Sequence, residues 1–296
     1  MIAFDGNPTI DINSEEVNAP GDIYIADSDG THLRRLTQTL DAGSPAWSPD
    51  GTQIAFVRAN WRGNYERSLW VMDADGSRPR ALVTRGPVGA PTWSPDGTRL
   101  AFGVQSRGLW VLDLATLRPR RLPFGAEGWF GPVGPRWSAD GAHLLVGATK
   151  KGPGPDDYTR TSGLFTVDAT TGGHAAQIPG ARNLLGWDWS WTNCRVILAQ
   201  GLQTRGASCA GNVYATDANL QHPTLLLRRL CAQSEPVWSP DGRQFAYIDH
   251  GAVWVANADG SEPHQVVQPL TAFARHAHGL GGVTGSVYSP AWQPVP

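Results

Sequence analysis

The pentapeptide Trp47-Ser48-Pro49-Asp50-Gly51 decides the fold, because it returns along the chain at nearly regular intervals. The same five residues stand at 93–97 and 238–242, and Trp-Ser-Ala-Asp-Gly stands at 137–141. Two further tryptophans hold the corresponding place without the full motif. The six units have cores that start near Trp47, Trp93, Trp137, Trp189, Trp238 and Trp292. A repeat with a period of roughly 40 to 50 residues indicates a stacked or radial architecture.

Each unit contains four short stretches with the character of β-strands. In the second unit, Trp93 lies in the first stretch, and 94–97 has Ser, Pro and Gly at the positions that a type I turn prefers. Further strands are expected at 100–104, 109–113 and 119–122. Short strands separated by turn residues predict an antiparallel meander. Six such meanders predict an all-β, six-bladed β-propeller with four-stranded antiparallel blades.

The two ends of the chain are expected to share one blade. Residues 2–4, Ile-Ala-Phe, match 54–56, which form the second strand of a unit, and 289–292 match the first strand at 44–47. The last blade is therefore completed by residues 1–40, and this closure removes exposed sheet edges. The intervals between the tryptophans account for the whole sequence, which predicts a single propeller domain spanning residues 1–296.

Composition excludes several classes of partner. The formal net charge of −2 provides no general attraction to nucleic acid. No apolar run approaches the roughly 20 residues of a membrane span. The first residues of the sequence lack the pattern of a signal peptide. We expect a monomer without a membrane span.

The three cysteines bear on the compartment. Cys209 precedes the third strand of its blade and Cys231 follows the fourth, so the two lie at the same end of neighbouring strands. This makes them a disulfide candidate, and the alternative is two unpaired buried thiols. A disulfide favours an extracytoplasmic location, periplasmic or secreted. Cys194 is expected to be a lone thiol.

Arginines gather in the expected fourth strands, at Arg34, Arg35, Arg78, Arg80, Arg118, Arg120, Arg121, Arg228 and Arg229. They favour either a basic rim for an acidic partner or the protection of sheet edges against aggregation.

The run from Trp47 to Gly76 resembles the TolB-type (WD40-like) propeller repeat. It combines Ser-Pro-Asp-Gly, an Ile-Ala-Phe strand and a Leu-Trp-Val-x-Asp-x-Asp-Gly hairpin, and 93–113 and 238–260 carry much of the same pattern. The resemblance implies a bacterial protein whose relatives bind partners at the cell envelope, sense ligands, or position substrates for peptidases. Some relatives are polysaccharide lyases with a metal site. TolB's N-terminal α/β domain has no counterpart here, so we expect a protein other than TolB itself.

The sequence lacks the Gly-x-Ser-x-Gly elbow, a phosphate-binding glycine loop and a His-Glu-x-x-His helix. We therefore predict a non-enzymatic binding, sensing or scaffold module that recognises a protein, a peptide or a carbohydrate. The long loops between second and third strands and between blades emerge on one face, where binding concentrates. The aromatic candidates on these loops are Trp61, Tyr65, Trp129, Phe130, Tyr158 and Phe273. The alternative is that they pack beneath their own loops.

Three charged residues precede blade tryptophans in consecutive units: Arg136, Asp188 and Glu235. Because the innermost strands converge on the axis, these side chains are expected to cluster near the channel mouth. They form either an ion network between blades or the lining of a ligand pocket.

The competing hypothesis is an enzyme. His276 and His278 alternate in the longest loop between blades and, with a carboxylate, are able to chelate a divalent metal. Such a site at the channel mouth predicts a metal-assisted polysaccharide lyase or glycosidase. Otherwise no cofactor is expected.

Overall fold

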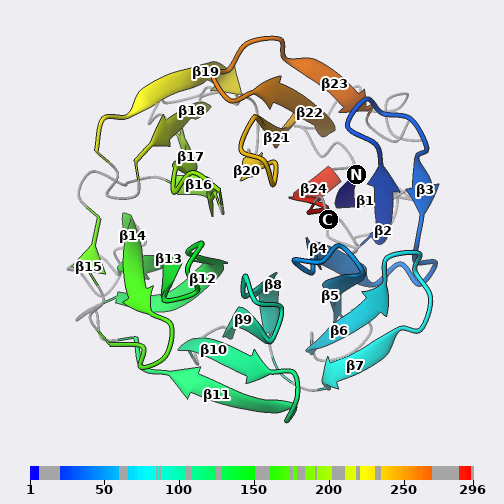
Figure 1. Ribbon diagram of the computed structural model, residues 1–296, viewed down its shortest axis with the longest axis vertical. Coiled ribbons are helices and arrows are strands. Elements are labelled where there is room, and N and C mark those ends of the chain that lie inside the picture. The colour runs from blue at the N-terminus through cyan, green and yellow to red at the C-terminus, as the bar shows by residue number, and fades with distance from the viewer. Residues whose placement is uncertain are drawn as a thin grey trace, which may run out of the picture.

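The computed structural model describes residues 1–6, 21–59, 66–84, 86, 88–104, 108–124, 129–150, 161–173, 176–178, 184–190, 192–201, 211–217, 221–230, 235–268 and 287–294. Within these ranges the chain is all β, with six four-stranded antiparallel sheets. The sheets are arranged radially around a common axis (Figure 1). The prediction of a six-bladed propeller is confirmed. No helix in the described ranges has the length and apolar character that crossing a bilayer requires.

Blades 1 to 3 follow one another along the chain, and each runs from the axis outward. Blade 1 comprises β4 Ala42–Trp47, β5 Gln53–Ala59, β6 Arg67–Asp73 and β7 Arg80–Val83. Blade 2 comprises β8 Val88–Trp93, β9 Arg99–Val104, β10 Gly108–Asp113 and β11 Arg118–Leu122. Blade 3 comprises β12 Trp129–Trp137, β13 His143–Lys150, β14 Thr161–Asp168 and β15 Ala176–Gln177.

Blades 4 to 6 complete the ring. Blade 4 comprises β16 Leu184–Trp189, β17 Val196–Gly201, β18 Gly211–Thr216 and β19 Thr224–Leu230. Blade 5 comprises β20 Val237–Trp238, β21 Gln244–Asp249, β22 Ala252–Asn257 and β23 His264–Val267. Blade 6 comprises β24 Val287–Trp292 followed by β1 Ile2–Gly6, β2 Asp22–Ala26 and β3 Arg34–Arg35.

Blade 6 joins the two ends of the chain, as the matching strands predict. Its strand order is β24-β1-β2-β3, and Ile2 pairs with Trp292. The Gln293 backbone N–H donates to the Met1 carbonyl at 2.8 Å, and the Gln293 side-chain amide donates to the Gly51 carbonyl at 2.9 Å. The labelled termini lie close together beside the axis (Figure 1). The second bond connects blade 6 to the first turn of blade 1.

The Ser-Pro-Asp-Gly motif forms the turn between the first and second strands of a blade. Ser48 Oγ donates to Asp50 Oδ1 at 2.6 Å and accepts a bond from the Gln53 N–H at 2.9 Å. Gly51 adopts a φ of 69°, a conformation that residues with a Cβ rarely reach. The Ser48 hydrogen bond lowers the pKa of Asp50. The same bonds recur at Ser94, Ser138 and Ser239. We call this end of the propeller the turn face.

The core lies between the blades. Six clusters of buried apolar side chains each join two neighbouring blades; one contains Val111 and Leu122 of blade 2 with Trp137 and Val146 of blade 3. The indole of Trp137 is fully buried and donates to the Thr92 carbonyl at 3.2 Å. Trp93 donates in the same way to the Ala46 carbonyl at 3.0 Å. The repeated tryptophan therefore connects each of these blades to the preceding one.

The boundaries of blade 3 differ from the sequence expectation. Trp129 and Phe130, expected in a loop between blades, belong to β12 and pair with Lys150 and Thr149 of β13. Irregularities in the β12 register accommodate the glycines and prolines of this segment. The ladder therefore extends beyond the point where strand-forming residues become sparse.

Candidate binding site at the propeller axis

The first polar group on the inner strands connects three consecutive blades. Arg136 Nε lies 3.2 Å from Asp188 Oδ1, and the Trp238 backbone N–H donates to Asp188 Oδ2 at 2.9 Å. Arg136 also donates from Nη1 to the Pro135 carbonyl at 3.0 Å. We call Arg136, Asp188 and Trp238 the inter-blade bridge.

The inter-blade bridge has the properties of a structural connection. The side chains of Arg136 and Asp188 are 23% and 16% exposed. Burial raises the pKa of Asp188, while Arg136 and the Trp238 N–H oppose the rise by favouring the carboxylate. Since both Asp188 oxygens already have a protein partner, this carboxylate is occupied in holding the blades together.

A second polar group lies farther from the turn face. Asp5 is in β1, and its side-chain Oδ1 accepts a bond from the Ser44 N–H of β4 at 3.2 Å. Burial raises the pKa of Asp5 well above its usual value, and the negative charge of Glu235 raises it further. We call Asp5, Ser44 and Glu235 the channel-mouth group; its members come from blade 6, blade 1 and the segment before β20 of blade 5.

The structure pairs two of the three charged residues that were expected to lie together. Arg136 and Asp188 immediately precede the tryptophans at the turn-face end of β12 and β16. Glu235 stands three residues before Trp238, and its charge acts on Asp5. The structure therefore brings Arg136 and Asp188 together, and Glu235 acts on Asp5.

Asp5 was missed by the reasoning from sequence, although the repeat contains a signal. Residues 2–4 match 54–56, so Asp5 occupies the place of Val57, which is buried in blade 1. An acidic residue at a position that is apolar in the matching strand indicates a special environment. A buried acid whose pKa is raised by burial and by a second acid is a candidate for a functional site.

Most other candidates lie outside the described residues, namely Trp61, Tyr65, Tyr158, Phe273, His276, His278, Cys209 and Cys231. For Trp129 and Phe130 the structure describes the backbone in β12. Gly211 pairs with Leu230, so the strands next to Cys209 and Cys231 are neighbours at this end. Cys194 is exposed and forms no disulfide. The described part of the chain has no group of three or more His, Cys, Asp or Glu residues suited to a metal ion.

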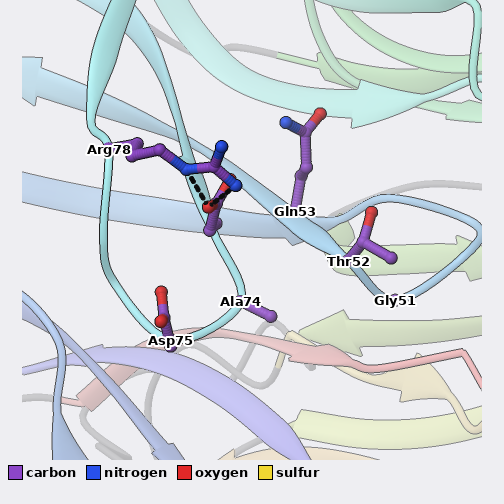
Figure 2. Close-up of a pocket in the computed structure, with 7 residues that line it drawn as sticks. Gly51, Thr52, Gln53, Ala74, Asp75 and Arg78 are labelled. Atoms are coloured by element: carbon purple, nitrogen blue, oxygen red, sulfur yellow. Dashed lines mark hydrogen bonds and ion pairs between the residues drawn. The ribbon is translucent and has the colours of Figure 1, made fainter.

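A shallow hollow lies on the turn face of blade 1, where the β4–β5 turn meets the β6–β7 turn (Figure 2). Its volume of about 480 Å³ is in the range of ligand pockets. However, Arg78 pairs with Asp73, the Ser77 N–H donates to Asp75 at 2.8 Å, and Thr52 Oγ1 donates to Asp50 at 2.9 Å. These polar groups stabilise their own turns, so we do not assign the hollow as a ligand site.

Comparison with known families gives one match. Residues 22–121 match the model of the lipoprotein LpqB β-propeller domain, which is 100 of the 296 residues. Among proteins with curated descriptions, none matches the sequence.

Solved structures extend the likeness to the whole chain. TolB from Acinetobacter baumannii is 20% identical with a TM-score of 0.72, over 99% of this chain and 66% of TolB. The fold is that of a TolB-type β-propeller. A putative TolB from Agrobacterium tumefaciens is 16% identical with a TM-score of 0.62, over 83% of this chain and 87% of its own. An oligogalacturonate lyase in complex with manganese is 15% identical with a TM-score of 0.52, over 82% and 71%. The expected resemblance is confirmed at the level of the fold.

Proposed function

We propose that this propeller is a binding module that recognises a protein or peptide at the end of the axis opposite the turn face. The observation that carries the proposal is the channel-mouth group. Asp5 is 9% exposed, the like charge of Glu235 raises its pKa, and it belongs to neither a turn nor the inter-blade bridge. An arrangement of acids that costs folding free energy is typical of a site kept for binding.

The two ends of the propeller differ in a way that supports this proposal. The aspartates of the turn face bond to residues of their own turns, as Asp50 does to Ser48 and Thr52. The longest connections between described strands, 7–21 and 268–286, both leave from the opposite end. Rigid scaffolds commonly present their binding residues on such connections.

The same proposal includes an extracytoplasmic location. The matched family model is described as a lipoprotein domain, and A. baumannii TolB shares the fold. A disulfide between Cys209 and Cys231 belongs to this part of the proposal and predicts that alkylation after denaturation modifies only Cys194.

A peptide-display selection tests the binding face. The exposed Cys194 lies in the β16–β17 connection at the turn face, so biotin attached there leaves the opposite end free. We expect selected peptides to protect the amides of 42–44, Glu235 and Val237 from hydrogen exchange. Protection confined to the Ser-Pro-Asp-Gly turns, or a selection that yields no binder, contradicts the proposal.

The competing function is a metal-assisted lyase, favoured by the likeness to the manganese-bound oligogalacturonate lyase. It requires His276 and His278 to bind metal. We expect no formation of unsaturated products from oligogalacturonate with added Mn²⁺. Turnover that disappears when His276 and His278 are replaced by alanine would overturn the assignment as a binding module.

A further inference from the structure

The charged residues within the outermost strands of the propeller are all basic. The six outermost strands, β3, β7, β11, β15, β19 and β23, contain arginine and histidine but no aspartate or glutamate. Basic residues are most concentrated in β11 of blade 2, where Arg118, Arg120 and Arg121 are all exposed. No described carboxylate lies within ion-pair distance of these three guanidinium groups.

Strand β11 also has the most regular free edge. All five of its residues pair with β10 without a register shift, from Asp113–Arg118 to Leu109–Leu122. In β7, β19 and β23 the register shifts, and β3 and β15 have two residues each. A straight edge strand is a template for an added strand.

Protection against aggregation does not account for all three arginines. Proline is tolerated in an edge strand where its missing N–H faces solvent, so Pro119 already removes one donor from the free edge. The backbone groups of residues i and i+2 are directed to the same edge of a strand. The N–H and C=O of Arg121 therefore lie on the same free edge as the N and C=O of Pro119. Because Pro119 lacks an N–H, backbone hydrogen bonds alone hold an added strand weakly at this edge. Binding therefore depends on side chains of the partner that fit the arginines.

The side chains match an extended acidic chain. Arg118 and Arg120 are two residues apart and therefore project on the same side of the strand, at the i, i+2 spacing of a second extended chain. Arg121 projects on the other side, where it lies over Gly108, a residue without a side chain to displace it. Guanidinium groups bind carboxylates through paired hydrogen bonds.

We propose that β11 is a docking strip for an extended protein segment with carboxylates at alternate positions. The arginines supply the affinity, and the free backbone groups of Arg121 fix the register. The strip lies on the circumference of blade 2 (Figure 1), away from the axis, so this inference does not depend on the function proposed above.

The test uses a synthetic peptide of alternating glutamate and threonine, with a glutamine–threonine peptide as its neutral counterpart. The test variant combines Arg118→Glu, Arg120→Glu and Arg121→Glu. The control combines Arg34→Glu, Arg80→Glu and Arg228→Glu, which makes the same change in net charge on three other outer strands. Three exposed ion pairs predict a loss in affinity of at least about tenfold for the test variant.

We expect less than about a threefold loss for the control, weaker binding at high salt, and protection of the Arg121 amide in the complex. An equal loss in both variants attributes binding to net charge and overturns the proposal. So does binding to phosphatidylglycerol vesicles without binding to the peptide. If the test variant fails to fold, the corresponding Arg→Gln set replaces it, and unchanged affinity there overturns the proposal.

Discussion

At the scale of single residues, one strained position recurs in the turns between third and fourth strands. His32, Arg78, His222 and Glu262 all have a φ near 50°. Each bonds to the residue five positions earlier: His32 to Asp27 at 2.7 Å, Arg78 to Asp73, His222 to Asp217 at 3.4 Å, and Glu262 to Asn257 at 3.2 Å. The residue types in this pair, and so their charges, differ between blades, but the contact between the two side chains is present in each of these four turns. The contact therefore offsets the strain of a left-handed backbone.

Leu117 holds a left-handed conformation without such a contact. Its φ is 53° and its side chain is 44% exposed. Leu117→Gly should raise the free energy of unfolding by up to about 1 kcal/mol, because relief of strain exceeds the added entropy of the unfolded chain. The control is Leu33→Gly, an equally exposed leucine without a positive φ, which should lower stability. Urea unfolding measures both, and a less stable Leu117→Gly protein contradicts the argument.

The raised pKa of Asp5 predicts a dependence of stability on pH. Above about pH 4 the unfolded state releases its proton, whereas the folded state retains it up to a higher pH. The free energy of unfolding therefore falls as the pH rises between these two pKa values. Asp5→Asn should remove this slope and raise stability at pH 7. Urea unfolding between about pH 4 and pH 8 measures the effect.

Asp188→Asn is the matched control for Asp5→Asn. Burial also raises the pKa of Asp188, but this carboxylate pairs with Arg136 and accepts from Trp238. Its neutralisation leaves Arg136 without its partner and should cost about 2–4 kcal/mol. If both substitutions destabilise the protein equally, Asp5 is a structural residue and the proposed site loses its main support.

At the scale of elements, the tryptophan at the end of each inner strand makes unequal contacts. The Trp137 indole donates to Thr92, and the Arg99 guanidinium lies 4.6 Å from the centre of its ring. Trp47 is buried to the same degree, but its indole nitrogen has no hydrogen-bond partner among the described residues. The same residue type therefore contributes different amounts of stability in different blades.

Trp137→Phe should consequently cost about 1–2 kcal/mol more than Trp47→Phe. Both substitutions remove the same volume, while the first also leaves the Thr92 carbonyl unsatisfied and the second removes an unsatisfied donor. Equilibrium unfolding of the two variants in urea gives the difference. An equal or larger loss for Trp47→Phe would show that packing alone decides.

The strands and turns could be predicted from sequence where local chemistry determines them. Ser48, Asp50 and Gly51 build their turn from bonds within five residues, so the motif alone reveals it. The start of β12 is different, because its pairing depends on how far β13 extends. Blade 4 also departs from the repeat: Trp187 stands where the other blades have proline, and it donates to the Gly134 carbonyl of blade 3 at 2.9 Å. Such adjustments depend on the neighbouring blade.

At the scale of the whole molecule, ring closure brings together residues that are remote in sequence. Asp5 contacts Ser44 of the following blade and is affected by Glu235 of the preceding one. No local pattern places these residues together, which is why the sequence predicts the ring but misses the composition of the channel-mouth group. The charges that precede the tryptophans are visible in sequence, and their partners become visible only when the ring is closed.

The closure itself can be tested by removing β24. Deletion of residues 287–296 leaves β1 without its inner neighbour and exposes Ile2 and Phe4, which are fully buried. We expect loss of cooperative unfolding in urea, and recovery of it when a synthetic peptide of residues 285–296 is added. Gln293→Ala, which removes only the bond to Gly51, should cost about 1 kcal/mol. A truncated protein as stable as the full chain would mean that five blades and an open sheet suffice, and that the shared blade does not hold the ring closed.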